Sequence, residues 1–182
     1  MAKNLTMVTC FSLFALCFFG NRAEALGPKG VGVKVGINLG RQQAIVPFAP
    51  GSAVGGQFDS AKLMMGGTLD LGSTFLPKLH LVSGGDLIHQ ADLNIISINT
   101  EFWYFFHQSD RVRGYAGGGI GAHLHRHKIE ANETKISLNI PIGFQRKLGP
   151  GTHWFGEIKL VLGDDESDSS LQFSVGLGFG SF

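Results

Sequence analysis

The chain has 182 residues, a length typical of a single domain. Charged residues make up 16% of it and 27 residues are glycine, so the composition excludes the charge-rich, hydrophobe-poor class of disordered proteins. No segment is basic enough to indicate binding to nucleic acid, since the 15 basic and 14 acidic residues nearly balance.

The N-terminus has the layout of a secretory signal peptide. Lys3 gives a short positive region, an apolar run covers 5–20, and Ala23 and Ala25 form a small-x-small cleavage site. A membrane-spanning anchor is the alternative, but the run is shorter than the ~20 residues that a spanning helix needs. We therefore expect a cleaved signal peptide at 1–25.

Removing this segment changes the character of the chain. Both cysteines lie within it, so the mature domain, 26–182, has no thiol and no disulfide. The loss of Lys3, Arg22 and Glu24 reduces the 15 basic and 14 acidic residues to 13 of each. A neutral, glycine-rich and apolar exported domain is poorly suited to be a soluble secreted protein.

Beyond the signal peptide, apolar and polar residues alternate with the period of two that is typical of β-strands. The alternation predicts eight strands of about ten residues, at 31–40, 63–72, 78–90, 94–106, 114–127, 135–145, 154–163 and 171–182. Pro141 weakens the sixth, since proline in sheets normally lies at edges or bulges. Because no helix is predicted to cover a sheet, an antiparallel up-and-down barrel is the simplest way to leave no strand edge.

The polar face of the predicted strands is rich in glycine, serine, asparagine and threonine, with isolated charges. These charged residues are Lys34, Asp70, Asp86, Glu101, Lys135, Glu157 and Lys159. A solvent-facing surface would carry many more lysines and glutamates, whereas the lumen of an eight-stranded barrel is only wide enough to be filled by side chains. We therefore expect these charges to line the lumen as a structural network in which lysines pair with carboxylates, because an unpaired buried charge is costly.

The opposite face carries branched aliphatic side chains almost without interruption. Aromatic residues gather near strand ends, as in the girdles of barrels that cross a membrane: Phe102, Tyr104, Phe106, Trp154, Phe179 and Phe182. The predicted fold is all-β, an eight-stranded antiparallel up-and-down transmembrane β-barrel. The alternative is a soluble secreted barrel of lipocalin type, with the apolar face inside around a small apolar ligand.

Four segments, in this order, carry a resemblance to a known family. They are "VGVKVGINLG" (31–40), "INTEFWYFF" (98–106), "RGYAGGGIGAHL" (113–124) and "LQFSVGLGFGSF" (171–182). They resemble the first strand, a central strand, the Y-x-G-x-G-x-G strand and the closing strand of small bacterial outer-membrane β-barrel proteins of the OmpA-like, porin-family type. The resemblance implies a location in the bacterial outer membrane, in contact with its lipid and with lipopolysaccharide.

In that family, a last strand that ends in Phe is the signal read by the barrel-assembly machinery, which implies this role for Phe179 and Phe182. Phe182 lies on the inward phase of the alternation, so one extra residue, a bulge near Gly180 or Ser181, is expected before it. With both termini periplasmic, the longest external loop is predicted at 42–60.

His123, His125 and His127 share one face of a predicted strand and are candidate metal ligands. The competing interpretation is polar filling of the lumen or rim, because no acid or cysteine nearby completes a ligand set. A lipid A-modifying barrel enzyme would need a serine held by a histidine and an acid, and the sequence shows no complete triad motif of this kind. We therefore predict a monomeric protein with a structural or surface-related role, without catalysis, open pore, cofactor or metal.

Overall fold

The described part of the protein is a closed ring of antiparallel strands. The computed structural model describes residues 27–40, 61–89, 93–127, 132–164 and 169–180. The strands are β1 (Gly30–Gly40), β2 (Lys62–Ser73), β3 (Leu79–His89), β4 (Leu93–Gln108), β5 (Val112–His127), β6 (Glu133–Gly149), β7 (Thr152–Gly163) and β8 (Ser170–Gly180). No helix in the described ranges is long and apolar enough to cross a membrane. The predicted signal peptide and the loop predicted at 42–60 lie outside these ranges.

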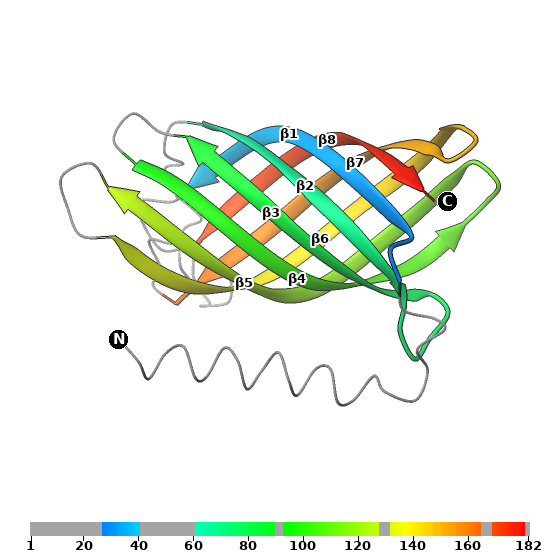
Figure 1. Cartoon of the computed structure of the whole chain (residues 1–182), viewed down its shortest axis with the longest axis horizontal. Helices are drawn as coiled ribbons and strands as arrows, with labels where there is room; N and C mark the ends of the chain where they lie inside the picture. The colour runs from blue at the N-terminus through cyan, green and yellow to red at the C-terminus, as the bar shows by residue number, and fades with distance from the viewer. Residues whose placement is uncertain (1–26, 41–60, 90–92, 128–131, 165–168, 181–182) are drawn as a thin grey trace, which may run out of the picture.

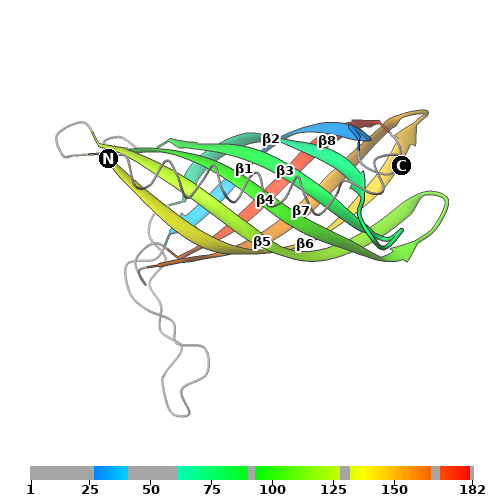
Figure 2. The same cartoon turned by 60° about the horizontal axis from the view of Figure 1, so that its bottom comes forward.

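Each strand pairs with its sequence neighbours, and β1 also pairs with β8, so the sheet closes on itself. The closing ladder runs from Gly30 opposite Gly180 to Gly40 opposite Ser170. The strands cross the long axis of the barrel obliquely (Figure 1), and the turned view shows the same tilt around the ring (Figure 2). We call the end at which β1 begins and β8 ends the terminal end, on the right in Figure 1, and the opposite end the distal end.

The prediction of an eight-stranded antiparallel barrel is confirmed. All the predicted strands are present, and β4, β5 and β6 extend beyond their predicted ends. The extra residues lengthen this side of the wall, which Figure 1 shows as the long hairpins of β4, β5 and β6.

The apolar face of the sheet lies outside and the polar face inside. In β1, Val33 is 57% exposed on the outer wall, whereas the next residue, Lys34, is 3% exposed in the lumen. Exposed aliphatic side chains continue around the wall, and buried polar ones, such as Asn139, continue around the lumen. This arrangement contradicts the soluble, lipocalin-type alternative, which requires the aliphatic face to be inside.

Exposed aromatic side chains gather on the outer wall near the terminal end. Tyr104 and Phe106 on β4, Phe144 on β6 and Phe179 on β8 are 42–56% exposed. Aromatic belts of this kind mark the level at which a barrel wall leaves the hydrocarbon. Of the two predicted assembly residues, Phe179 lies in this belt; Phe182, with the bulge expected before it, lies outside the described residues.

Two features of β6 show how the sequence fits a narrow lumen. A Cβ on Gly143 would lie 2.5 Å from the hydroxyl of Tyr115 and 2.6 Å from the carbonyl oxygen of Gly156, so the absence of a side chain leaves room for the phenol ring. Pro141 is buried and stays paired with Lys159 of β7, while the ladder between β5 and β6 lacks the pairs beside it. Proline, which has no N–H, is accommodated where a ladder is interrupted.

Candidate functional site

Five of the predicted charges meet in the middle of the lumen, brought there by β1, β3, β4 and β7. Lys34 Nζ lies 3.1 Å from Asp86 Oδ1 and 3.5 Å from Glu157 Oε1. Lys159 Nζ lies 2.7 Å from Glu101 Oε1 and 3.6 Å from Glu157 Oε1. Each of the five residues is at most 5% exposed. Glu157 thus joins two ion pairs into one buried group, which we call the central charge cluster.

The cluster has three carboxylates for two ammonium groups, and neutral donors serve the remaining carboxylate oxygens. The hydroxyl of Tyr115 donates to Glu157 Oε2 at 2.9 Å. The indole N–H of Trp103 donates to Glu101 Oε2 at 2.8 Å. Hydrogen bonds of this kind stabilise a buried carboxylate in its ionised form without a further positive charge.

On its distal side the cluster continues as a chain of hydrogen bonds between buried polar side chains. Asn99 Nδ2 donates to the aspartate of the cluster at 3.0 Å, and Asn139 Nδ2 donates to Asn99 Oδ1 at 2.9 Å. Ser137 Oγ then donates to Asn139 Oδ1 at 2.9 Å. His123 lies between two hydroxyls, with Nε2 2.6 Å from Ser137 Oγ and Nδ1 2.7 Å from Ser97 Oγ. The lumen on the distal side of the cluster therefore contains a network of buried side chains that hydrogen-bond to one another.

On its terminal side the cluster is covered by aromatic rings. Trp103 and Tyr115 stack with their centroids 4.1 Å apart and 9° between their planes, and Phe105 packs edge-on against Tyr115 at 5.8 Å. The guanidinium carbon of Arg113 lies 4.4 Å from the centroid of Phe105. We call Trp103, Phe105 and Tyr115 the aromatic plug. Trp103 and Tyr115 occupy inward positions of the alternation in β4 and β5. Small residues and charges were expected to fill the lumen, so the plug was not predicted.

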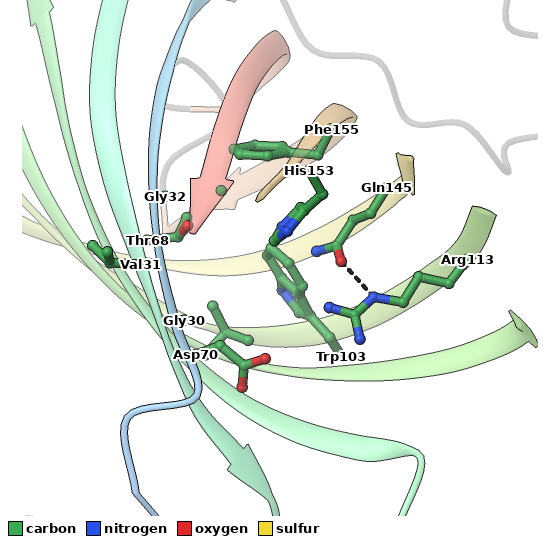
Figure 3. A pocket seen from close by; sticks show the side chains of 12 residues that line it. Gly30, Val31, Gly32, Thr68, Asp70, Trp103, Arg113, Gln145, His153 and Phe155 are labelled. Carbon is green, nitrogen blue, oxygen red and sulfur yellow. Dashed lines mark hydrogen bonds between the residues drawn. The ribbon is translucent and has the colours of Figure 1, made fainter. Parts of the chain in front are cut away.

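A small cavity lies between the plug and the terminal opening (Figure 3). Its volume is about 30 Å³, and the backbone of Gly30 and Gly178 forms one wall. Side chains from β5, β6 and β7 form the other, where Arg113 Nε donates to Gln145 Oε1 at 2.5 Å and His153 lies alongside. A polar space of this size holds about one water molecule.

The structure corrects the expected network at Asp70 and Lys135, which lie apart from the central charge cluster. Asp70 is near the terminal end of β2, where its Oδ2 lies 2.9 Å from His80 Nδ1. Lys135 is near the distal end of β6, where its Nζ lies 3.7 Å from Glu133 Oε2. Alternation fixes which face a residue occupies but not its height along the barrel, so inward residues at opposite ends do not meet.

The candidate histidines do not form a shared site in the described residues. His123 is engaged by two serines, His125 is half-buried near the distal rim, and the side chain of His127 lies outside the described part. Across the described ranges, no group of three or more His, Cys, Asp or Glu side chains is placed to hold a metal ion. The serine hydroxyls beside His123 belong to residues that are 1% and 4% exposed, so a substrate has no access to them.

Comparison with known proteins identifies the fold. No protein-family model matches the sequence, and no curated protein matches it. Among solved structures, Neisserial surface protein A (NspA) superposes with a TM-score of 0.60 at 12% identity, covering 83% of this chain and 97% of that one. The N-terminal β-barrel domain of OprF from Pseudomonas aeruginosa gives a TM-score of 0.58 at 12% identity, covering 85% of this chain and 99% of that one. The chain has the fold of the small outer-membrane β-barrels. At this level of identity the likeness is one of fold.

Proposed function

We propose that the protein is an integral β-barrel of the bacterial outer membrane, exported with cleavage of a signal peptide at 1–25 and inserted with its terminal end toward the periplasm. The observation that carries this proposal is the exposed aliphatic wall around a lumen of buried charges, as at Val33 and Lys34. In water such a wall would cause copies of the protein to associate, whereas a barrel that is surrounded by lipid needs an apolar outer surface. The closed hydrogen-bonded ring supports the same conclusion, because lipid cannot satisfy an open strand edge.

The role that we propose is structural and surface-related, without an open pore and without catalysis. The central charge cluster fills the middle of the lumen, and the aromatic plug covers its terminal side. In an eight-stranded barrel, side chains of this size leave no wide passage. The proposed surroundings are outer-membrane phospholipid and lipopolysaccharide, with the barrel-assembly machinery as a transient partner that reads the last strand, including Phe179 and Phe182. We propose that the inserted protein is a monomer.

Cell fractionation and gel mobility test the membrane placement. We expect the protein in the outer-membrane fraction, soluble only with detergent, and migrating faster in unheated than in boiled samples because the closed barrel resists the detergent. Recovery of the folded protein from the soluble periplasmic fraction would refute the proposal.

Ion conductance in planar bilayers tests the sealed lumen. We expect no stable conductance steps from the intact protein, because the central charge cluster and the aromatic plug block the axis in series. Replacing Trp103 and Tyr115 by Ala removes the two stacked rings of the plug and two hydrogen bonds to the cluster, but keeps the ion pairs of the cluster, so this variant is also expected to stay closed. Stable conductance steps from the unaltered protein would contradict a sealed lumen.

A further inference from the structure

A groove crosses the outer wall over β6, β7, β8 and β1. Its volume is about 360 Å³, which lies in the size range of ligand pockets. Its outward-facing walls are aliphatic and aromatic, formed by Val35, Ile37, Ile142, Phe144, Ile158 and Val175. Most of these residues lie in the middle part of their strands, and Phe144 lies nearer the terminal end, so the groove opens on the wall itself and not on either mouth of the barrel.

Gly156 is one of the residues that line the groove. It is an outward-facing position of β7 that has no side chain, between Phe144 of β6 and Val175 of β8, its partners in the two ladders. The ring of Phe144 lies against this glycine, because a Cβ on Gly156 would lie 3.0 Å from it, and the ring forms one wall of the groove. An empty hollow in lipid forfeits dispersion contacts, so an acyl chain lying in the groove gains contacts on three sides that a flat wall does not give.

A cationic side chain lies beside the terminal end of this groove. Arg146 is exposed, two residues beyond Phe144 on the outward face of β6, and it is paired with Trp154 of β7. Trp154 packs edge-on against Phe144, with ring centroids 4.9 Å apart and 87° between the planes. Within the described part of the chain, Arg146 has no ion-pair partner. Trp and Arg at this level are typical of the membrane interface, and a guanidinium can bind a phosphate through two hydrogen bonds.

We propose that one phospholipid binds at this place, with an acyl chain in the groove over Gly156 and its phosphate on Arg146. The inference rests on the proposed placement of the barrel in the membrane. It selects phospholipid over lipopolysaccharide because Arg146 is at the terminal end, which the proposed function places in the periplasmic leaflet. A headgroup with net negative charge is the preferred ligand, since the exposed charged side chain beside the groove, Arg146, is positive.

Quenching of tryptophan fluorescence by brominated lipid measures this selectivity. The chain has two tryptophans; Trp154 is next to the groove, and Trp103 is buried in the plug and gives a constant background. The full chain is inserted into phosphatidylcholine vesicles that contain increasing fractions of brominated phosphatidylglycerol or, in parallel, brominated phosphatidylcholine. We expect phosphatidylglycerol to quench at lower mole fractions, with about fivefold preference over phosphatidylcholine, the selectivity that one interfacial Arg provides.

Two variants test the two halves of the site, each with a matched control. Arg146→Gln is expected to lower the preference for phosphatidylglycerol over phosphatidylcholine about fivefold. Lys78 is an exposed lysine in the turn between β2 and β3, and Lys78→Gln is expected to leave this preference unchanged. Gly156→Leu places a bulky side chain against the ring of Phe144 and in the groove, and is expected to lower the preference for phosphatidylglycerol to a ratio near one. Gly118→Leu adds the same side chain on β5, where the nearest atom to a new Cβ is 3.9 Å away, and is expected to leave it unchanged.

The outcomes separate this proposal from the proposed function. Equal quenching by the two brominated lipids in the unaltered protein, or equal effects of Gly156→Leu and Gly118→Leu, would overturn the lipid site and leave the membrane barrel standing. No quenching of Trp154 by either lipid would overturn the membrane placement, and the lipid site with it. Gel mobility shows that each variant is folded before it is compared.

Discussion

Replacing Lys159 by Met is expected to destabilise the barrel by about 3–5 kcal/mol, the usual cost of removing one partner of a buried ion pair. Lys159 Nζ lies 2.7 Å from Glu101 and 3.6 Å from Glu157. At an effective dielectric constant of about 20, these separations correspond to attractions of about 6 and about 5 kcal/mol, of which the desolvation of the ammonium group offsets a large part. Without Lys159, three carboxylates share the single ammonium group of Lys34.

The measurement is urea unfolding of the inserted barrel, followed by tryptophan fluorescence, with the change in free energy taken from the midpoint at equal slope. Lys135→Met is the matched control. Its partner Glu133 is well exposed at the distal rim, so a loss below about 1 kcal/mol is expected. Adding Glu101→Gln to Lys159→Met is expected to recover part of the loss, because it removes the carboxylate left without its ammonium partner. Equal losses in the two lysine variants, or no recovery in the double variant, would refute the reasoning.

Three further predictions concern the wall, the lumen and the histidine. Ile158→Arg, in the middle of the outer wall, is expected to cost about 2–4 kcal/mol in urea unfolding from vesicles, and Leu148→Arg, near the terminal end, at most about 1 kcal/mol; equal costs would contradict the membrane level assigned to the wall. Gly143→Ala is expected to cost about 1–3 kcal/mol because the new methyl collides with the aromatic plug, whereas Gly118→Ala, with open space beside it, should change the midpoint little. His123→Ala removes the histidine partner of the buried Ser97 hydroxyl and one of the two partners of the Ser137 hydroxyl, so a loss of about 1–3 kcal/mol is expected in urea unfolding. Cells that produce this variant are expected to have the same lipid A mass spectrum as cells that produce the unaltered protein, and a difference between the two spectra would point to an enzyme.

The sequence was sufficient to predict which face of each strand is inward, because side chains alternate strictly along a strand. Lys34, Glu101 and Lys159 lie buried in the lumen, as the alternation predicts. The small number of charges on the polar face was the reason for predicting that the apolar face meets lipid. The height of each residue along the barrel was not predictable in the same way. It depends on the register of every ladder, so Asp70 and Lys135 were expected in a network that they do not reach.

The contact between Ser97 and His123 shows why register was out of reach. The two residues are directly opposite in the ladder of β4 and β5, and a bulge between Phe105 and His107 shifts that ladder near its turn. Counting back from the turn without the bulge would place Ser97 opposite Leu124, which is on the other face. A single extra residue in one strand changes every pairing beyond it. The alternation of apolar and polar residues in β4 does not show where the bulge lies.

The ladder between β1 and β8 has a consequence for how the chain must be made. The other ladders join strands that follow one another, so each can form once its turn is made, but Gly30 cannot pair with Gly180 until β8 has been synthesised. Before β8 is paired, the folded part of the chain is an open sheet with two unpaired edges and an exposed apolar face. Such a species aggregates readily. A chain that ends before β8 is therefore not a smaller barrel but an aggregation-prone fragment with unpaired strand edges. The cell has to keep the nascent polypeptide unfolded until β8 has been synthesised.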